Sequence, residues 1–336
     1  MSTTWHKIIF LGVLFAVVVV INTQSRTQEV AIFQDRSSNI AAAERARLSP
    51  RQVFVENTLP KSERPTRVEV SESQATVPAS GGPLEKNYDA VNGLSLSTTK
   101  ALVTDLQSGE RLYELNTSDR WPLASLSKVM TAVVATKLTP HDQIVQISQA
   151  DFSPLDTSEF HSLQVGENYK VEDLIRAMMI ASSNQAAEAL ARVPGREAFI
   201  NEMRNQASDW DMQNTYFGDP AGLSSTNQST LDDLEKMIGH VWREYPSVFD
   251  YSRSSNRAIV DPLTGRAVVL YAIHRYANDP EFRGGKTGYT EAARENLISV
   301  FELDGRLIAI VVLGSRDRFG DTEELLQWTK NRLSLI

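Results

Sequence analysis

At 336 residues the chain is long enough for one large domain or two small ones. It contains no cysteine, which excludes disulfides, thiolate catalysis and zinc–thiolate sites. The whole chain carries a net charge of −8 and residues 1–84 contribute +2, so residues 85–336 carry −10. An acidic domain without a basic stripe argues against nucleic acid as a partner.

An apolar run opens the chain at residues 8–21, directly after Lys7. Fourteen residues is short for a membrane-spanning helix and typical of a signal-peptide core. Because no A-x-A-like cleavage site follows, we interpret residues 1–22 as an uncleaved anchor, with a cleaved signal as the alternative. Either interpretation places the rest of the chain outside the cytoplasm.

The next segment, residues 23–85, combines five prolines and a Gly-Gly pair with mixed charges and few aromatic side chains. Such a composition cannot bury enough apolar surface to offset the entropy of ordering. We therefore predict an extracytoplasmic disordered linker at 23–85 and a folded domain at 86–336.

Within the folded domain, two β-type runs at 100–106 and 111–115 flank a hairpin turn. A second hairpin is predicted near the other end, where 296–303 and 306–313 meet across an Asp-Gly pair. Strands at both ends with helices between them indicate an α+β fold whose hairpins can join one antiparallel sheet. Apolar periodicity predicts the helices at 125–138, 171–180, 184–192, 195–207, 230–244 and 322–333.

Three short motifs stand in order along the domain: S-x-x-K at 125–128, S-x-N at 182–184 and K-T-G at 286–288. Together they form the signature of penicillin-binding proteins and serine β-lactamases. Only K-T-G is unique, since S-x-x-K recurs at 97–100 and S-x-N recurs at several positions. Local context must therefore select the functional copies.

The two S-x-x-K copies differ in their setting. The copy at 97–100 leads into a strand, where residues three apart point to opposite faces. Ser125 instead opens a long run without Gly or Pro, which predicts a buried helix. Residues three apart share one face of a helix, so Ser125 and Lys128 can touch as nucleophile and base.

The residue types of the three motifs suggest a different chemical role for each motif. Lys128 can act as a base only when neutral, which requires burial and a nearby cation such as Lys286. Ser182 is placed to relay a proton to the leaving amine, and Asn184 to contact the substrate backbone. A simpler interpretation is that Ser182, Ser183 or Asn184 caps the following helix, and the two roles are compatible.

The third motif is predicted to lie on a strand at the edge of a cleft. A substrate can add to that edge as an extra strand, and its carboxylate can bind Lys286 and Thr287. Gly288 allows a close backbone approach, although the neighbouring glycines are equally suited to a tight turn.

Beyond the trio, the chain resembles the serine D-alanyl-D-alanine peptidases, the low-molecular-mass penicillin-binding proteins. The resemblance extends from about residue 90 to 336. It implies a β-lactamase/transpeptidase-like fold, in which an antiparallel sheet of about five strands packs with helices. It is carried by 123–132, 171–187, 217–223 and 285–290.

The same resemblance implies an oxyanion hole made by the backbone N–H groups of Ser125 and Tyr289. Only 48 residues follow Gly288, too few for the additional C-terminal domain of the longer members. The chain is therefore most similar to the short penicillin-binding-protein-7-like branch, the D-alanyl-D-alanine endopeptidases. Arg275 is a candidate for the family arginine that binds the substrate carboxylate, and surface charge is the alternative.

The resemblance implies peptidoglycan stem peptides or their cross-links as substrates and β-lactam antibiotics as covalent inhibitors. We predict no cofactor and no metal site, since the five histidines are scattered without an H-x-x-x-H pair. A β-lactamase is one alternative, although the Glu-x-x-Leu-Asn loop of one class is missing from the sequence. A non-catalytic penicillin-recognising sensor module is another, although all the motif residues are present.

Overall fold

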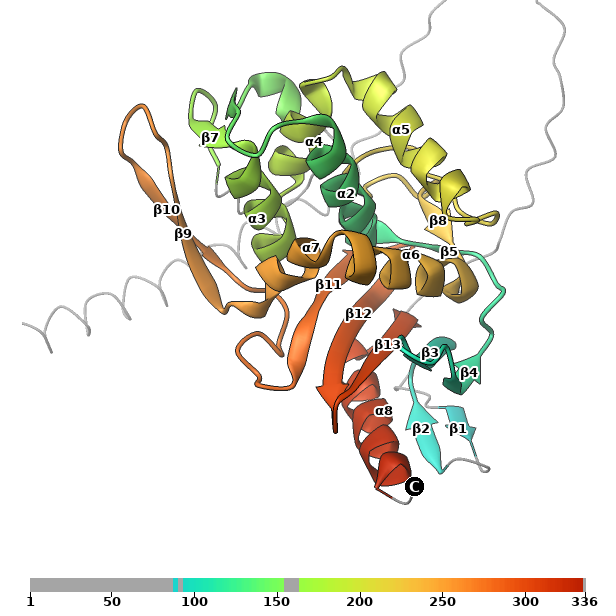
Figure 1. The fold of residues 1–336 in the computed structure, drawn as a ribbon. Helices are drawn as coiled ribbons and strands as arrows, with labels where there is room; N and C mark the ends of the chain where they lie inside the picture. Colours follow the sequence, from blue (N-terminus) through green and yellow to red (C-terminus); the bar gives the residue numbers. More distant parts are fainter. Residues whose placement is uncertain (1–86, 90–92, 154–162, 335–336) are drawn as a thin grey trace, which may run out of the picture. The chain divides into compact units, whose positions relative to one another are not determined.

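The computed structural model describes residues 87–89, 93–153 and 163–334 (Figure 1). The predicted anchor or signal at 1–22 and the linker at 23–85 lie outside these residues, so the domain boundaries stay predictions. None of the helices in the described ranges is long and apolar enough to cross a membrane.

A five-stranded antiparallel sheet forms the centre of the described structure, with the order β11-β12-β13-β3-β4. Both predicted hairpins belong to it, and they join where β13 pairs with β3. This arrangement confirms the predicted α+β class and the single sheet. The strands are β3 (Lys100–Asp105), β4 (Arg111–Leu115), β11 (Phe282–Thr290), β12 (Arg294–Leu303) and β13 (Arg306–Ser315).

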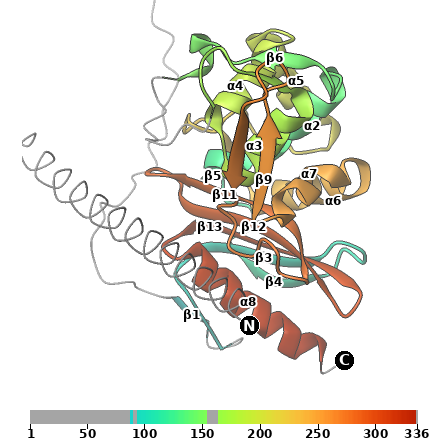
Figure 2. The same cartoon turned by 90° about the vertical axis from the view of Figure 1, so that its left-hand side faces the viewer.

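Both faces of the sheet are covered, which explains why β13 is almost entirely apolar. Helix α8 (Arg318–Leu333) packs on one face, and the remaining helices cover the other (Figure 2). Successive side chains of β12 divide between the two cores. Ile298 and Val300 enter the larger core, whereas Leu297 and Phe301 enter the core beneath α8.

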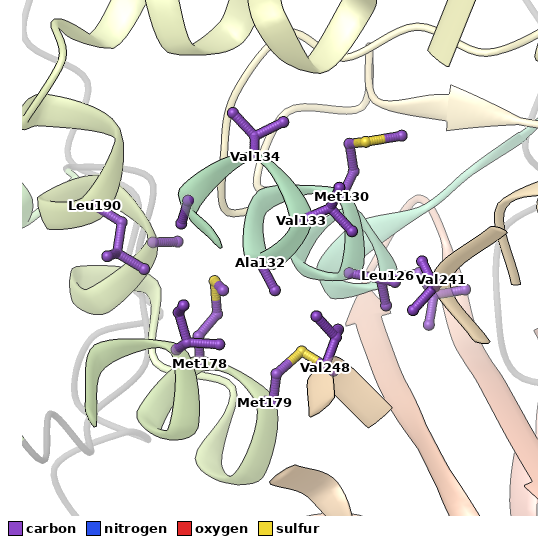
Figure 3. Close-up of a cluster of buried hydrophobic side chains, with 14 of the residues drawn as sticks. Leu126, Met130, Ala132, Val133, Val134, Met178, Met179, Leu190, Val241 and Val248 are labelled. Atoms are coloured by element: carbon purple, nitrogen blue, oxygen red, sulfur yellow. The ribbon is translucent and has the colours of Figure 1, made fainter. Parts of the chain in front are cut away.

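Helix α2 (Lys128–Leu138) lies at the centre of the helical layer (Figure 3). Its first eight residues are all buried, which agrees with the run of apolar residues that predicted it. In Figure 3 the labelled side chains around it include Met178, Leu190, Val241 and Val248, which come from other helices of this layer. The other helices of this layer are α3 (Val171–Ala181), α4 (Asn184–Arg192), α5 (Arg196–Asp209), α6 (Leu231–Glu244) and α7 (Pro246–Asp250).

The nucleophile segment differs from its prediction in one respect. The predicted helix at 125–138 begins as a 3-10 turn, η1 (Ala124–Ser127), and becomes α-helical only at Lys128. The backbone of Ala124 is left-handed, with φ +49°, and this conformation breaks the helix before Ser125. Ser125 therefore lies on a tight turn at the start of the helix.

Several short elements were not predicted. The hairpin of β9 (Asn256–Val260) and β10 (Ala267–Tyr271) buries Ile259 and Leu270 and exposes its other face. The turn η3 (Tyr251–Arg253) precedes it and contacts β11. The remaining elements are β1 (Asn87–Asp89), β2 (Leu94–Leu96), β5 (Trp121–Pro122), β6 (Ile144–Gln146), η2 (Gln149–Asp151), β7 (Asn168–Lys170) and β8 (Gln228–Ser229).

Candidate active site

Ser125 and Lys128 form the centre of the candidate site. The Nζ atom of Lys128 lies 2.8 Å from the Oγ atom of Ser125, as expected for residues three apart on one turn. Lys128 is fully buried, whereas Ser125 is half-buried. The hydroxyl can therefore meet a substrate while the amine behind it is shielded from water.

Two further partners of Lys128 define how its amine is oriented. Nζ donates to Asn184 Oδ1 at 2.7 Å and to the carbonyl of Ala221 at 2.6 Å. Both oxygens can only accept hydrogen bonds, so the amine directs one N–H group to each of them. When Lys128 is neutral, its lone pair is left to face the hydroxyl of Ser125, which is the arrangement a general base needs.

The carbonyl of Ala221 is held by a turn built around the carboxylate of Asp219. That carboxylate, itself buried, accepts four backbone N–H groups. The turn also packs against the nucleophile, because Gly222 has φ +81° and a Cβ there would lie 1.9 Å from the carbonyl of Ala124. The four N–H donors belong to Ala221, Gly222, Leu223 and Ser224.

In the second motif, one serine caps a helix and the other contacts Lys286. Ser183 is the N-cap of α4, and its Oγ accepts from the N–H of Ala186 at 3.2 Å. Ser182 ends α3 in a left-handed conformation, with φ +57°. Left-handed non-glycine residues are strained and concentrate at functional sites. The hydroxyl of Ser182 is turned away from the capping role and meets Lys286.

Lys286 is buried on β11, and its Nζ lies 2.8 Å from Ser182 Oγ and 2.8 Å from the carbonyl of Thr287. Burial holds the pKa of Lys286 well below its usual range, and the charges of Lys128 and Arg318 lower it further. The structure therefore places two buried lysines in electrostatic contact, each beside a serine.

The outer edge of β11 faces the site. The N–H of Gly285 points away from β12 and donates to Ser252 Oγ at 2.9 Å. Backbone groups alternate in direction along an antiparallel strand, so the N–H groups of Thr287 and Tyr289 point the same way. The Tyr289 side chain itself is exposed. This edge can pair with an added strand and present the Tyr289 N–H to a substrate carbonyl.

Gly288 brings this edge against the nucleophile turn. A Cβ at Gly288 would lie 2.9 Å from the carbonyl of Leu123 and 3.3 Å from the backbone nitrogen of Ser125. The lack of a side chain lets the K-T-G strand approach this closely. The N–H groups of Ser125 and Tyr289 consequently belong to adjacent backbone segments, as the predicted oxyanion hole requires.

A third cation, Arg318, was missed by the sequence analysis. Its Nη1 donates to the carbonyl of Gly288 at 3.0 Å, and its Nε is buried with no hydrogen-bond partner among the described residues. Burial lowers the pKa of Arg318. No motif marks this arginine, which starts α8 thirty residues after Gly288.

Arg275, the predicted carboxylate-binding arginine, is not brought into this cluster. Its side chain is exposed and makes no hydrogen bond or ion pair with another described residue. Its neighbour His274 is buried behind β11. The structure thus unites the other predicted residues, which are Ser125, Lys128, Ser182, Asn184, Lys286, Thr287, Gly288 and Tyr289.

The chemistry of the cluster favours anions. Across the described ranges, no group of three or more histidine, aspartate or glutamate side chains is arranged to hold a metal ion. The amines of Lys128 and Lys286 and the guanidinium of Arg318 supply hydrogen-bond donors instead, and each carries positive charge when protonated. Such a site can stabilise a substrate carboxylate and the oxyanion of an acyl-transfer reaction.

Comparisons with known proteins agree with this chemistry. A family model described as D-alanyl-D-alanine carboxypeptidase matches residues 87–317. The D-alanyl-D-alanine endopeptidase of Pseudomonas aeruginosa is 28% identical over 264 residues, covering 76% of this chain and 82% of that protein. The D-alanyl-D-alanine carboxypeptidase DacC of Escherichia coli is 31% identical over 257 residues, covering 71% of this chain and 62% of that protein.

Among solved structures, penicillin-binding protein D2 of Listeria monocytogenes in its cefotaxime-bound form superposes with a TM-score of 0.62. It is 30% identical, and the match covers 70% of this chain and 98% of that one. The similarity therefore includes nearly the whole of a protein whose structure holds a β-lactam.

Proposed function

Because the chain belongs to the D-alanyl-D-alanine carboxypeptidase family, and so is a serine D-alanyl-D-alanine peptidase, we propose that it cleaves its substrates through an acyl-enzyme on Ser125. The observation that carries this proposal is the environment of Lys128. Its amine lies 2.8 Å from Ser125 Oγ and donates hydrogen bonds to Asn184 Oδ1 and to the carbonyl of Ala221.

In the acylation step, Ser125 Oγ attacks the carbonyl carbon of the penultimate D-alanine and gives its proton to Lys128 Nζ. The negative charge on the carbonyl oxygen is stabilised by the N–H groups of Ser125 and Tyr289. The C–N bond then breaks as Ser182 gives its hydroxyl proton to the leaving amine and takes up the proton that Lys128 received from Ser125. Lys128 is thereby neutral again for deacylation, and Lys286 holds Ser182 Oγ at 2.8 Å throughout.

Deacylation uses the same groups with water as the nucleophile. Water attacks the ester carbonyl, and its proton passes to Lys128. The C–O bond to Ser125 breaks, Ser125 Oγ is reprotonated by Lys128, and a carboxylic acid product leaves. No metal or organic cofactor is required in either step.

Two basic groups beside β11 support recognition of the substrate carboxylate. Nζ of Lys286 donates to the carbonyl of Thr287, and Nη1 of Arg318 donates to the carbonyl of Gly288, the next residue of the strand. Substrate chain beyond the scissile bond can bind there, and so can the acidic group of a β-lactam. We therefore assign the carboxylate-binding role to Arg318 in place of Arg275.

We propose peptidoglycan stem peptides, and above all their cross-links, as the substrate class. Carboxypeptidase and endopeptidase reactions share one acyl-enzyme, so the geometry serves both. The relative from Pseudomonas aeruginosa is named as an endopeptidase, which favours cross-links. Digesting purified monomeric and cross-linked dimeric muropeptides should convert dimers to monomers. Loss of only the terminal D-alanine from monomers would show a carboxypeptidase instead.

Covalent labelling tests the nucleophile. A fluorescent penicillin should label the full chain, and the Ser125→Ala variant should remain unlabelled while keeping the melting temperature of the unchanged protein. Labelling of that variant at the original rate would refute the assignment of Ser125. Rapid, many-turnover hydrolysis of nitrocefin would indicate a β-lactamase.

We also propose that the enzyme acts outside the cytoplasm, where peptidoglycan lies. The apolar run at 8–21 supports export of the chain, either as an anchor or as a cleaved signal. Fractionation of cells and N-terminal sequencing of the mature protein test both parts. A protein recovered in the cytoplasm with its first residues intact would contradict the proposal.

A further inference from the structure

A buried histidine behind the K-T-G strand has no role in the chemistry described so far. His274 packs on the α8 side of the sheet, with its ring centroid 4.4 Å from that of Phe282 and 6.1 Å from that of Phe319. The side chain is only 5% exposed. Its Nδ1 atom is buried without a hydrogen-bond partner among the described residues. A phenylalanine would avoid this unsatisfied atom, so packing alone does not explain a histidine here.

The other ring nitrogen binds the strand pair that carries Lys286. Nε2 of His274 lies 3.1 Å from the carbonyl of Ile298, the residue of β12 that pairs with Lys286. A carbonyl oxygen can only accept a hydrogen bond, so Nε2 carries the ring proton and donates the hydrogen bond to Ile298. A Cβ at Gly285 would lie 2.8 Å from Nε2, so the imidazole fills the space left by this glycine.

Ile273, the residue before His274, binds the helix that ends at Ser182. The N–H of Ile273 donates to the carbonyl of Ile180 at 3.2 Å, and Ile180 lies two residues before Ser182 on α3. Two consecutive residues, Ile273 and His274, therefore connect the helix of Ser182 with the strand pair of Lys286.

We propose that His274 is a positioning residue that sets the separation of Ser182 and Lys286. This inference rests on the proposed function, because it takes the Ser182–Lys286 pair as the route of the proton to the leaving amine. The two side chains meet at 2.8 Å although they are 104 residues apart in the chain. A displacement of about 1 Å can cost on the order of 100-fold in rate. The contacts of Ile273 and His274 that fix this distance should therefore affect the rate of acylation.

Two substitutions separate positioning from packing. His274→Phe keeps the ring and removes both the donor and the unsatisfied Nδ1, so its melting temperature should stay equal or rise. Its rate constant for acylation by a fluorescent penicillin should nevertheless fall about tenfold or more. His274→Gln retains an N–H donor, and its acylation rate should stay within about threefold of the unchanged protein.

Combining His274→Phe with Ser182→Ala identifies the route of the effect. If His274 acts through the Ser182–Lys286 pair, His274→Phe should change the rate little in the Ser182→Ala background. A tenfold loss that persists in that background would overturn the proposal, as would unchanged acylation by His274→Phe. These outcomes are independent of the proposed nucleophile, which is tested by labelling of Ser125→Ala.

Discussion

Two lysine–serine pairs occupy the candidate site, and they are built in different ways. Ser125 and Lys128 are three residues apart on one turn, so local backbone geometry alone brings them within 2.8 Å. Ser182 and Lys286 also lie 2.8 Å apart, but they come from α3 and β11, 104 residues distant in sequence. The first pair is local, and the second depends on how the helical layer meets the sheet.

The difference indicates which pair tolerates movement. A shift of β11 against the helices leaves the Ser125–Lys128 distance unchanged but separates Ser182 from Lys286. The local pair is therefore suited to hold the nucleophile and its base in every substrate complex. The distant pair keeps its 2.8 Å separation only while contacts between the helical layer and the sheet hold α3 and β11 in place.

The largest effect should come from removing the base of the local pair. Lys128→Met keeps the length of the side chain and cannot accept the proton of Ser125, so acylation by a fluorescent penicillin should slow by about 1,000-fold. Stability should fall by about 1–3 kcal/mol, because Asn184 Oδ1 and the Ala221 carbonyl lose their buried donor. Lys137→Met, an ion-paired surface lysine on the same helix, is the matched control. A Lys128→Met variant that is labelled at the original rate would exclude this lysine as the base.

The turn that supports the local pair should be nearly as sensitive. Gly222→Ala forces a side chain into φ +81° and places its Cβ 1.9 Å from the carbonyl of Ala124. We expect about 3 kcal/mol or more of lost stability, measured by urea unfolding, and loss of labelling. Gly265→Ala has a similar φ of +76° but nothing within 4 Å, so it should cost only about 1 kcal/mol. Equal losses in the two variants would show that strain, and not contact with the nucleophile turn, limits Gly222.

Adjacent serines provide a smaller and sharper test of the distant pair. Ser182→Ala removes the partner of Lys286 and should slow acylation by about 10- to 100-fold with little change in melting temperature. Ser183→Ala removes the N-cap of α4 and should cost about 1 kcal/mol of stability with little change in rate. The reverse pattern would mean that the roles of the two hydroxyl groups are exchanged.

Much of this site could be predicted because its first part is local. The motif spacing and the apolar run after Ser125 predicted the contact of Ser125 with Lys128 and the buried helix, and both hairpins of the sheet were predicted from turn residues. The clustering of the three motifs was expected from the resemblance and has no origin in local spacing. The start of α2 was misplaced because nothing in the sequence marks the left-handed Ala124. Helix α8 begins at Arg318 and not at 322, and the β9–β10 hairpin was not predicted.

The residues that were missed act through tertiary contacts. Arg318 begins α8, which lies on the face of the sheet opposite the other helices, and its guanidinium donates to the carbonyl of Gly288. The turn around Asp219 was noticed as a family-like segment, but its contact through Ala221 with Lys128 spans 93 residues. Arg275 was predicted from the resemblance as the family arginine that binds the substrate carboxylate, but its side chain is exposed while that of His274 is buried. Charge and proximity in sequence do not determine the direction of a side chain.

The last prediction concerns pH and His274, the residue proposed to position the distant pair. Burial, together with the charges of Lys286 on β11 and Arg318 on α8, lowers the pKa of His274 from 6.5 to about 3, and the hydrogen bond with the Ile298 carbonyl opposes this shift. Between these two values the unfolded chain binds a proton that the folded chain does not, so stability falls as the pH falls below 6.5. One such group contributes at most about 1.4 kcal/mol per pH unit. Urea unfolding at pH 6.5, 5 and 4 should therefore show a shallower loss for His274→Phe than for the unchanged protein, with the half-exposed His141→Phe as control. Parallel stability curves would show that His274 binds its proton equally in both states, and that the distant pair is not protected by a neutral imidazole.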